Sequence, residues 1–112
     1  MELIKKKSGI QVYHHPNREI RSYLTTDEIS RFRVEVFRAA DREAFEDQLK
    51  GLGTIGEHVV REVTSIPGVR DLEIKPRELR VIKKTSASWD AIEEKIIQAL
   101  NTAFRRKKIR IV

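Results

Sequence analysis

Three histidines, His14, His15 and His58, are the residues of this sequence best suited to bind a metal ion. Imidazole nitrogens are common ligands of zinc and related ions. Adjacent histidines on a strand point to opposite faces, so His14 and His15 cannot readily ligate one ion from regular strand geometry. His58 has no second histidine one helical turn away. The spacing therefore predicts solvated or structural histidines and no metal site.

The segment 51–56, Gly-Leu-Gly-Thr-Ile-Gly, fits the G-x-G-x-x-G pattern of dinucleotide-binding turns. That motif requires a buried hydrophobic strand directly before its first glycine. The preceding residues, 45–50, have the spacing of an amphipathic helix instead. We therefore predict a break between two helices. Anion binding by the amide-rich turn, at the start of the second helix, remains an alternative.

Carboxylates, serines and cysteines give no support for catalysis. The acidic pairs 46–47 and 93–94 are successive residues on expected helices and face different directions, which makes them poor acid/base dyads. The serines lack a nucleophile-elbow pattern. The sequence contains no cysteine, which removes disulfides, thiol catalysis and thiolate metal ligation within these residues. We predict no catalytic and no cofactor-binding residues, and hence no enzyme.

Positive charge is the strongest binding signal. The chain of 112 residues has a formal net charge of +6, and residues 1–24 carry five Lys or Arg against two acids. A second basic run supplies the predicted partner-binding residues Arg105, Arg106, Lys107, Lys108 and Arg110. We expect an acidic protein partner, because no aromatic residues for base stacking interleave with these cations. A nucleic-acid-binding module, a structural subunit, or simple complementation of a helix dipole remain alternatives.

The strands that must position these residues follow from alternating patterns. A hairpin is expected over 9–14 and 19–24 around Pro16-Asn17, and a second over 69–75 and 79–84. A half-buried strand is expected near 32–36, with Phe32, Val34 and Val36 on one face and Phe37 on the other. Ile109 to Val112 resembles a short closing strand.

Three helices complete the predicted fold. Asp41 is expected to cap a short helix that buries Phe45, Leu49 and Leu52. Thr54 and Glu57 form a capping-box pattern for a helix that ends before Pro67-Gly68. Ser88 is expected to cap the last helix, whose apolar stripe is Ile92, Ile96, Leu100, Ala103 and Phe104. The fold class is thus α+β: one domain, a mainly antiparallel sheet of about five strands, two to three helices, and the C-terminal helix packed on the sheet.

Trp89, the only tryptophan, begins that last helix. We expect it to pack over the edge of the sheet, with an exposed partner anchor as the alternative. No apolar run approaches the length of a membrane span, and residues 1–10 lack the apolar core of a signal peptide. Together with the absent cysteines, this leads us to expect a cytoplasmic protein without a membrane partner.

Several of these segments together resemble the N-terminal domain of Nfu/NifU-type scaffold proteins. The resemblance rests on Ile10 to Ile20 with its Pro-Asn turn, on Ile66-Pro67-Gly68-Val69, on Leu79 to Lys84, and on Ser88-Trp89-Asp90 followed by 92–100. The order and spacing agree over nearly the whole chain. One Pro-Asn stands where the family has it doubled, and His14-His15 precede it where Thr-Pro is usual.

The resemblance implies an accessory role in iron–sulfur cluster assembly, in cluster delivery or partner docking. In that family a separate domain with a Cys-x-x-Cys motif supplies the cluster ligands. No cysteine is present here, so we expect no thiolate-bound cluster. The matched positions are turn and core residues, and no functional site transfers from them. The expected mechanism is protein–protein recognition through an exposed face, with a cluster-carrying scaffold as a candidate partner.

Overall fold

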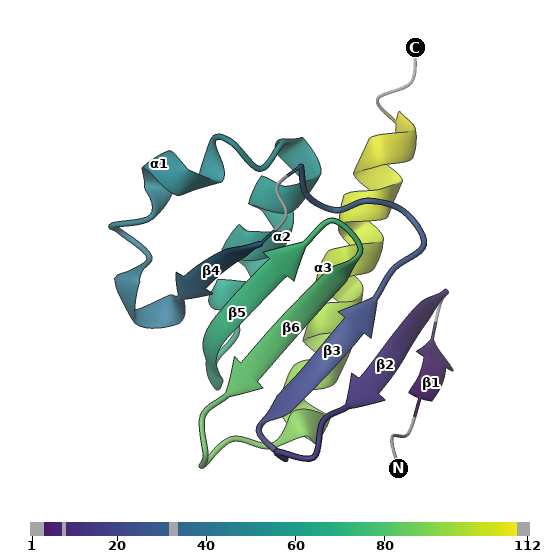
Figure 1. The fold of residues 1–112 in the computed structure, drawn as a ribbon, viewed down its shortest axis with the longest axis vertical. Coiled ribbons are helices and arrows are strands. Elements are labelled where there is room, and N and C mark those ends of the chain that lie inside the picture. The colour runs from purple at the N-terminus through teal and green to yellow at the C-terminus, as the bar shows by residue number, and fades with distance from the viewer. Residues whose placement is uncertain (1–3, 8, 32–33, 110–112) are drawn as a thin grey trace.

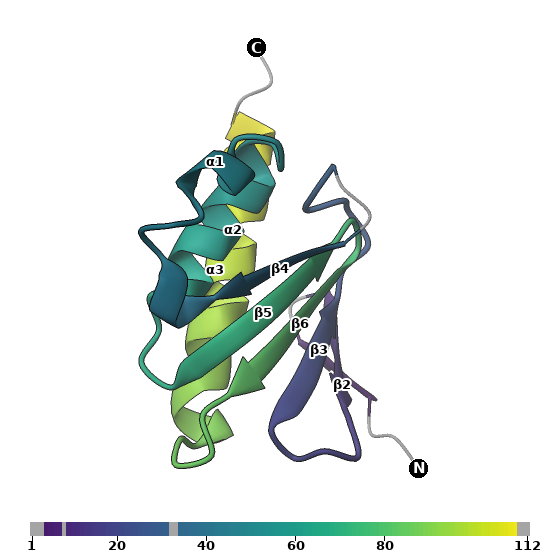
Figure 2. The same ribbon diagram turned by 60° about the vertical axis from the view of Figure 1, so that its left-hand side comes forward.

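A computed structural model describes residues 4–7, 9–31 and 34–109 of the chain, with side chains for 9–31 and 34–105. Its six strands form one antiparallel sheet in the order β1-β2-β3-β6-β5-β4. The helices α2 and α3 lie on one face of this sheet, as Figures 1 and 2 show. The predicted α+β class is confirmed, with one strand more than the five expected. The elements are β1 (Ile4–Lys7), β2 (Ile10–His14), β3 (Ile20–Leu24), β4 (Glu35–Arg38), a 3₁₀ turn (Ala39–Asp41), α1 (Glu46–Leu49), α2 (Thr54–Thr64), β5 (Val69–Lys75), β6 (Glu78–Lys83) and α3 (Trp89–Ile109).

Both predicted hairpins are present, and the turn of the first is closed by local hydrogen bonds. In the first, the Asn17 side chain accepts a bond from the Glu19 amide at 2.9 Å, and the Asn17 carbonyl accepts one from Ile20. Such Asx turns are the reason why asparagine favours these positions. The second hairpin pairs β5 with β6, and β6 in turn pairs with β3, so the two hairpins join at the centre of the sheet.

The core lies between the sheet and the two long helices. The predicted stripe on α3 is confirmed: Ile92, Ile96, Leu100 and Ala103 are buried, and Phe104 packs against the same cluster. The buried side chains of β2, β3, β6 and β5 face this stripe from the sheet. They include Val12, Tyr23, Leu79, Val81, Leu72 and Ile74. Ser88 caps α3 as expected, because its hydroxyl accepts a hydrogen bond from the Asp90 amide at 3.2 Å.

The strand after residue 31 has the opposite facing from the one predicted. Phe37 is 1% exposed, whereas Val34 and Val36 are 45% and 54% exposed. Phe37 is paired with Leu72 on β5 and stacks edge-on against Phe45, with ring centres 5.0 Å apart. Because side chains alternate along a strand, this one contact reverses the facing of every neighbour. The expected inward position of Phe32 lies outside the described residues.

The region 39–57 also departs from expectation. A 3₁₀ turn and the single-turn α1 replace the helix predicted from Asp41, and α1 begins after Phe45. The apolar residues Phe45, Leu49 and Leu52 are nevertheless buried as predicted. The capping box is wrong: α2 begins at Thr54 itself, Gly53 occupies the N-cap, and the Glu57 side chain bonds Arg61 at 3.0 Å. Because the Glu57 carboxylate pairs with Arg61, one helical turn further along, it does not cap the start of α2.

The two ends of the chain bring the remaining differences. Ile4–Lys7 forms β1, an edge strand that the alternating pattern did not reveal. Ile109 is the last residue of α3, so it is not in a closing strand, and 110–112 lie outside the described residues. In the described part of the chain, none of the helices has both the length and the apolar character needed to traverse a bilayer.

Candidate functional site

The predicted partner-binding residues begin at the end of α3. Arg105 is exposed and lies within hydrogen-bond distance of the Thr102 hydroxyl, 3.5 Å away. The helix continues through Ile109, so the backbone of Arg106, Lys107 and Lys108 extends the same axis. Arg110 lies outside the described residues. Cations in the last turns of a helix are favourable beside its partial negative charge.

A pocket of about 530 Å³ adjoins this helix end. Two apolar residues contribute to its wall: Ile10 at the start of β2 and Phe104 on α3. Its other lining residues are Gly9, Thr26, Asp27, Asn101 and Arg105, and we call the whole the α3-end pocket. Pockets of this volume accommodate small ligands or a few side chains. The pocket places Arg105 beside an apolar recess.

The loop that forms one wall of the α3-end pocket is fixed by hydrogen bonds. The Thr25 hydroxyl donates to the Asp27 carbonyl at 2.8 Å, and the Thr25 amide donates to the Arg77 carbonyl at 3.0 Å. Ile29, 1% exposed, donates its amide to the Pro76 carbonyl in the neighbouring turn. This wall is therefore held in place by the turn between β5 and β6.

The first basic cluster of the sequence, 5–7, lies on β1 at the edge of the sheet. Strand β1 pairs with β2 so that Lys7 is opposite Ile10 and Lys6 is opposite Gln11. Gly9 and Ile10, at the start of β2, line the α3-end pocket together with Asn101, Phe104 and Arg105 of α3.

The opposite end of α3 is a structural junction. Trp89 is 8% exposed, and its indole donates to the Arg18 carbonyl at 2.7 Å. The Arg21 guanidinium lies 4.9 Å from the indole ring centre and pairs with Glu93 at 2.8 Å. Tyr23 donates its hydroxyl to the same carboxylate at 2.9 Å. The predicted packing of Trp89 over the sheet is confirmed, and the exposed-anchor alternative is wrong.

This junction changes the acidity of Tyr23. Burial, followed by the nearby charge of Glu93, raises the pKa of the Tyr23 hydroxyl well above its ordinary range. The phenol therefore stays protonated and acts as a hydrogen-bond donor throughout the physiological range. Its role is to tie β3 to α3.

The sheet face away from the helices carries a polar network that the sequence analysis missed. Ser22 donates its hydroxyl to Glu78 at 2.7 Å, and His15 Nε2 lies 2.8 Å from the same hydroxyl. Since a carboxylate can only accept, the serine proton is committed, and His15 must donate through Nε2. Arg80 lies 3.4 Å from Glu73 and 3.6 Å from Glu78. The signal in the sequence that could have revealed this network is the run of polar residues at the outward positions of β3 and β6.

The geometry of this network opposes nucleophilic catalysis. A serine nucleophile needs a base that accepts its proton, whereas Ser22 already donates to a carboxylate and receives a bond from histidine. Burial and the nearby Arg80 lower the pKa of His15 below its ordinary value of 6.5, against the opposing effect of Glu78. His15 is thus neutral at pH 7 and serves to orient Ser22, with Tyr13 edge-on at 4.6 Å.

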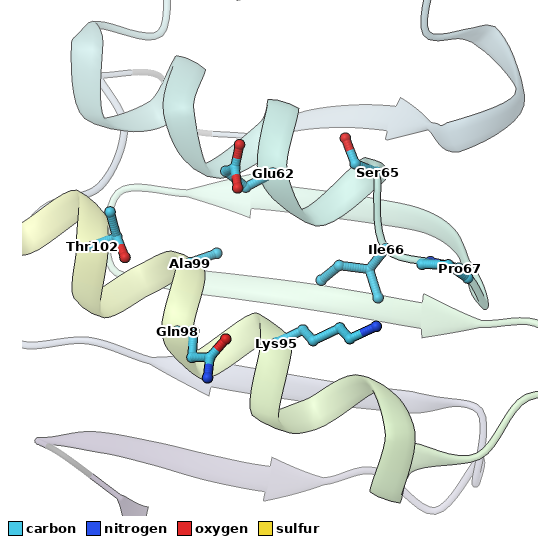
Figure 3. A pocket seen from close by; sticks show the side chains of 8 residues that line it. All are labelled: Glu62, Ser65, Ile66, Pro67, Lys95, Gln98, Ala99 and Thr102. Atoms are coloured by element: carbon cyan, nitrogen blue, oxygen red, sulfur yellow. The ribbon is translucent and has the colours of Figure 1, made fainter.

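A second groove, of about 410 Å³, runs between α2 and α3 (Figure 3). Glu62 and Ser65 border it from α2, Lys95 and Thr102 border it from α3, and the Ile66-Pro67 turn closes one end. Its lining contains one acid, Glu62, and one base, Lys95, so neither sign of charge dominates. This groove provides no chemistry beyond that of an ordinary helix–helix surface.

The three glycines of the G-x-G-x-x-G segment have separate structural roles. Gly51 follows α1 in a turn, and Gly53 adopts a φ of +93° before α2, as the predicted helix break requires. Gly56 lies inside α2, where a Cβ would come within 2.8 Å of the Ile29 carbonyl oxygen. Across the described residues, no three potential ligands among His, Cys, Asp and Glu gather as a metal site.

Comparison with known proteins gives a structural match. No protein-family model and no curated protein sequence matches the chain. The fold is similar to the solution structure of a NifU-like protein from Saccharomyces cerevisiae, with 21% identity over 87% of this chain and 78% of that chain, and a TM-score of 0.67. It is also similar to the crystal structure of protein SAV1430 from Staphylococcus aureus, with 10% identity over 86% and 98% of the two chains and a TM-score of 0.56. The chain therefore has an Nfu/NifU-type fold.

Proposed function

We propose that this protein is a non-catalytic accessory module of iron–sulfur cluster assembly and acts by docking to an acidic, cluster-carrying protein. The observation that carries the proposal is the fold shared with a NifU-like protein over 87% of the chain. The Pro-Asn turn, the Ile-Pro-Gly-Val turn and the Ser-Trp-Asp helix start support it from the sequence.

Those three motifs contribute to the fold. In the Ile-Pro-Gly-Val turn the Val69 amide donates to the Ile66 carbonyl at 3.1 Å, and the Gly68 carbonyl accepts from Lys84 at 2.7 Å. The Pro-Asn turn ends beside Arg18, whose carbonyl holds the Trp89 indole. The resemblance therefore supports a common fold. The docking residues must lie elsewhere on this chain.

Cluster ligation does not fit the residues that are present. The sequence has no cysteine, and His15 is engaged with Ser22. In the proposed role the cluster is cargo held by the partner. The surface we assign to docking is the basic end formed by Arg105, Arg106, Lys107, Lys108 and Arg110.

The test measures binding of this protein to a cluster-loaded Cys-x-x-Cys scaffold from the same organism, and the transfer of the cluster from that scaffold. We expect the protein to bind this scaffold and to alter the rate at which its cluster reaches an apo-ferredoxin. The scaffold alone and the scaffold with serum albumin are the controls. Binding that is undetectable at micromolar concentrations, together with an unchanged transfer rate, would contradict the proposal. Capture that disappears on nuclease treatment would favour the nucleic-acid alternative.

A further inference from the structure

We propose that the outer edge of β4 binds an extended segment of a partner protein as an added strand, with one apolar side chain of that segment in a pocket beside β4. This inference goes beyond the proposed function, because it assigns a second interaction surface that does not depend on the basic end of α3.

Strand β4 has a free edge. It is the last strand of the sheet and pairs with β5 alone. In an antiparallel pair the backbone groups of alternate residues point to the partner strand, so those of the intervening residues point away from it. In the part of the chain that the structure describes, no backbone hydrogen bond outside the helices and sheet ladders involves 35–38. The outward N–H and C=O groups of β4 are therefore the groups with which an added strand would pair.

A pocket of about 310 Å³ lies along this edge, and we call it the β4-edge pocket. Its lining includes three successive strand residues, Val36, Phe37 and Arg38. Because successive side chains point to opposite faces, a space that touches all three lies beside the strand and not over one face. The other lining residues are Asp41, Ala44, Phe45 and Gln48. The pocket is thus placed to receive a side chain of a strand added at this edge.

The segment 39–49 forms the helix side of the β4-edge pocket and is held in place at two points. Phe45 is 4% exposed and stacks edge-on against Phe37. Arg61 on α2 holds the Glu46 carboxylate through two hydrogen bonds of 2.8 and 2.9 Å. In Figure 1 this segment extends beyond β4 on the side away from β5. The pocket therefore has a fixed wall on the side of the helices.

The side chains at the edge favour an uncharged segment rich in β-branched residues. Val34 and Val36 are exposed large apolar side chains, and Val36 faces away from the helices because Phe37 is buried toward them. Apolar and β-branched residues opposite each other stabilise neighbouring strands. The pocket lining contains one cation, Arg38, and one acid, Asp41, so it selects neither sign of charge. The occupant that fits is an extended segment with alternating valines and no net charge.

A separate segment fits this edge better than a second copy of the chain. Antiparallel pairing of two identical edges places a twofold axis normal to the sheet, so the helices of both copies would lie on the same side. Each copy would then bring its own segment 39–49 toward the space beneath the other's β4, which Phe37 and Phe45 already fill. An isolated strand carries no such second layer.

The test of main-chain pairing uses two fluorescent peptides of alternating threonine and valine. The second peptide has the same side chains, but its three central amides are N-methylated, which blocks hydrogen bonding at both of its edges. Fluorescence anisotropy measures both against the folded wild-type protein. We expect the methylated peptide to bind at least about tenfold more weakly. On binding of the unmethylated peptide, alternate backbone amides of 35–38 should exchange more slowly with deuterium.

Substitutions locate the pocket. Ala44→Trp should fill the β4-edge pocket and weaken binding of the unmethylated peptide by about tenfold. Ala40→Trp is the matched control, because it places the same side chain at an exposed position of the same segment outside the lining. It should change the affinity by less than about twofold. Circular dichroism shows whether each variant is folded, and Gln48→Trp fills the pocket from α1 if Ala44→Trp fails to fold.

Three outcomes would overturn the proposal. Equal affinity of the two peptides, or no saturable binding of the unmethylated one, would rule out strand addition at β4. Equal effects of Ala44→Trp and Ala40→Trp would rule out the pocket. A wild-type dimer in analytical ultracentrifugation that Ala44→Trp dissociates would show that a second copy occupies the edge in place of a separate segment.

Discussion

At the scale of single residues, His15, on the sheet face away from the helices, makes the stability of the fold depend on pH. It donates through Nε2 to Ser22, and burial together with Arg80 lowers its pKa below 6.5. The unfolded chain therefore takes up this proton at a higher pH than the folded chain does. Stability from the neutral histidine is fully present above pH 6.5, and it is lost as the pH falls from there toward the folded-state pKa.

His15→Gln is the corresponding experiment, since the amide keeps a donor but does not titrate. We expect the wild type to lose stability as the pH falls below about 6.5, and the variant to show a shallower loss. Urea unfolding midpoints at several pH values measure this. His14 and His58 are common to both proteins, so the difference in slope isolates His15. Parallel pH profiles would show that the pKa of His15 is the same in the folded and unfolded chains.

At the scale of elements, the Ile-Pro-Gly-Val turn sets how closely β5 approaches α3. Gly68 has a φ of +100°, and a Cβ there would come within 2.9 Å of both Ala87 Cβ and Ile92 Cδ1. Gly68→Ala should lower the free energy of unfolding by about 2 kcal/mol or more through strain and overlap. Gly9→Ala is the matched control, because its φ is +80° and its surroundings are open, so it measures backbone strain alone. Equal losses would mean that the contact with α3 relaxes without cost.

The apolar stripe of α3 gives the second prediction at this scale. Leu100 is completely buried, so Leu100→Ala should lower the free energy of unfolding by roughly 2–5 kcal/mol. Gln98→Ala, on the exposed face of the same helix, should change it by less than about 0.5 kcal/mol. Chemical denaturation of both variants provides the comparison. A loss below about half a kilocalorie for Leu100→Ala would show that the helix is not packed on the sheet as described.

Elements with strong internal patterns were predictable from the sequence, and elements defined by tertiary contacts were not. The stripe on α3 and the Asn17 turn are local signals, and both are confirmed. The facing of β4 is set by a long-range contact, the pairing of Phe37 with Leu72. The single-turn α1 has only four residues, too few for helix propensity to define its bounds. Local patterning therefore predicted the hairpins and α3 correctly, whereas the facing of β4 and the helix from Asp41 were predicted wrongly.

The candidate site divides in the same way. Arg105 was identified from composition, because a basic run is visible in the sequence alone. The α3-end pocket was not, since it requires Ile10, Asp27 and Phe104, which are far apart in sequence, to meet. The Ser22–Glu78 network was missed for a similar reason: its members lie on β3 and β6, whose pairing is a long-range contact.

At the scale of the whole molecule, the given sequence offers no cysteine that could ligate an iron–sulfur cluster. Iron–sulfur clusters are held by cysteine thiolates, or by histidine in place of some of them. We expect the purified protein to remain without a stoichiometric cluster after anaerobic reconstitution with iron and sulfide, judged by absorbance and by iron analysis. A cysteine-containing scaffold treated in parallel is the positive control. A stoichiometric cluster on this chain would contradict the cargo role of the cluster, and His15→Gln would then show whether His15 ligates it.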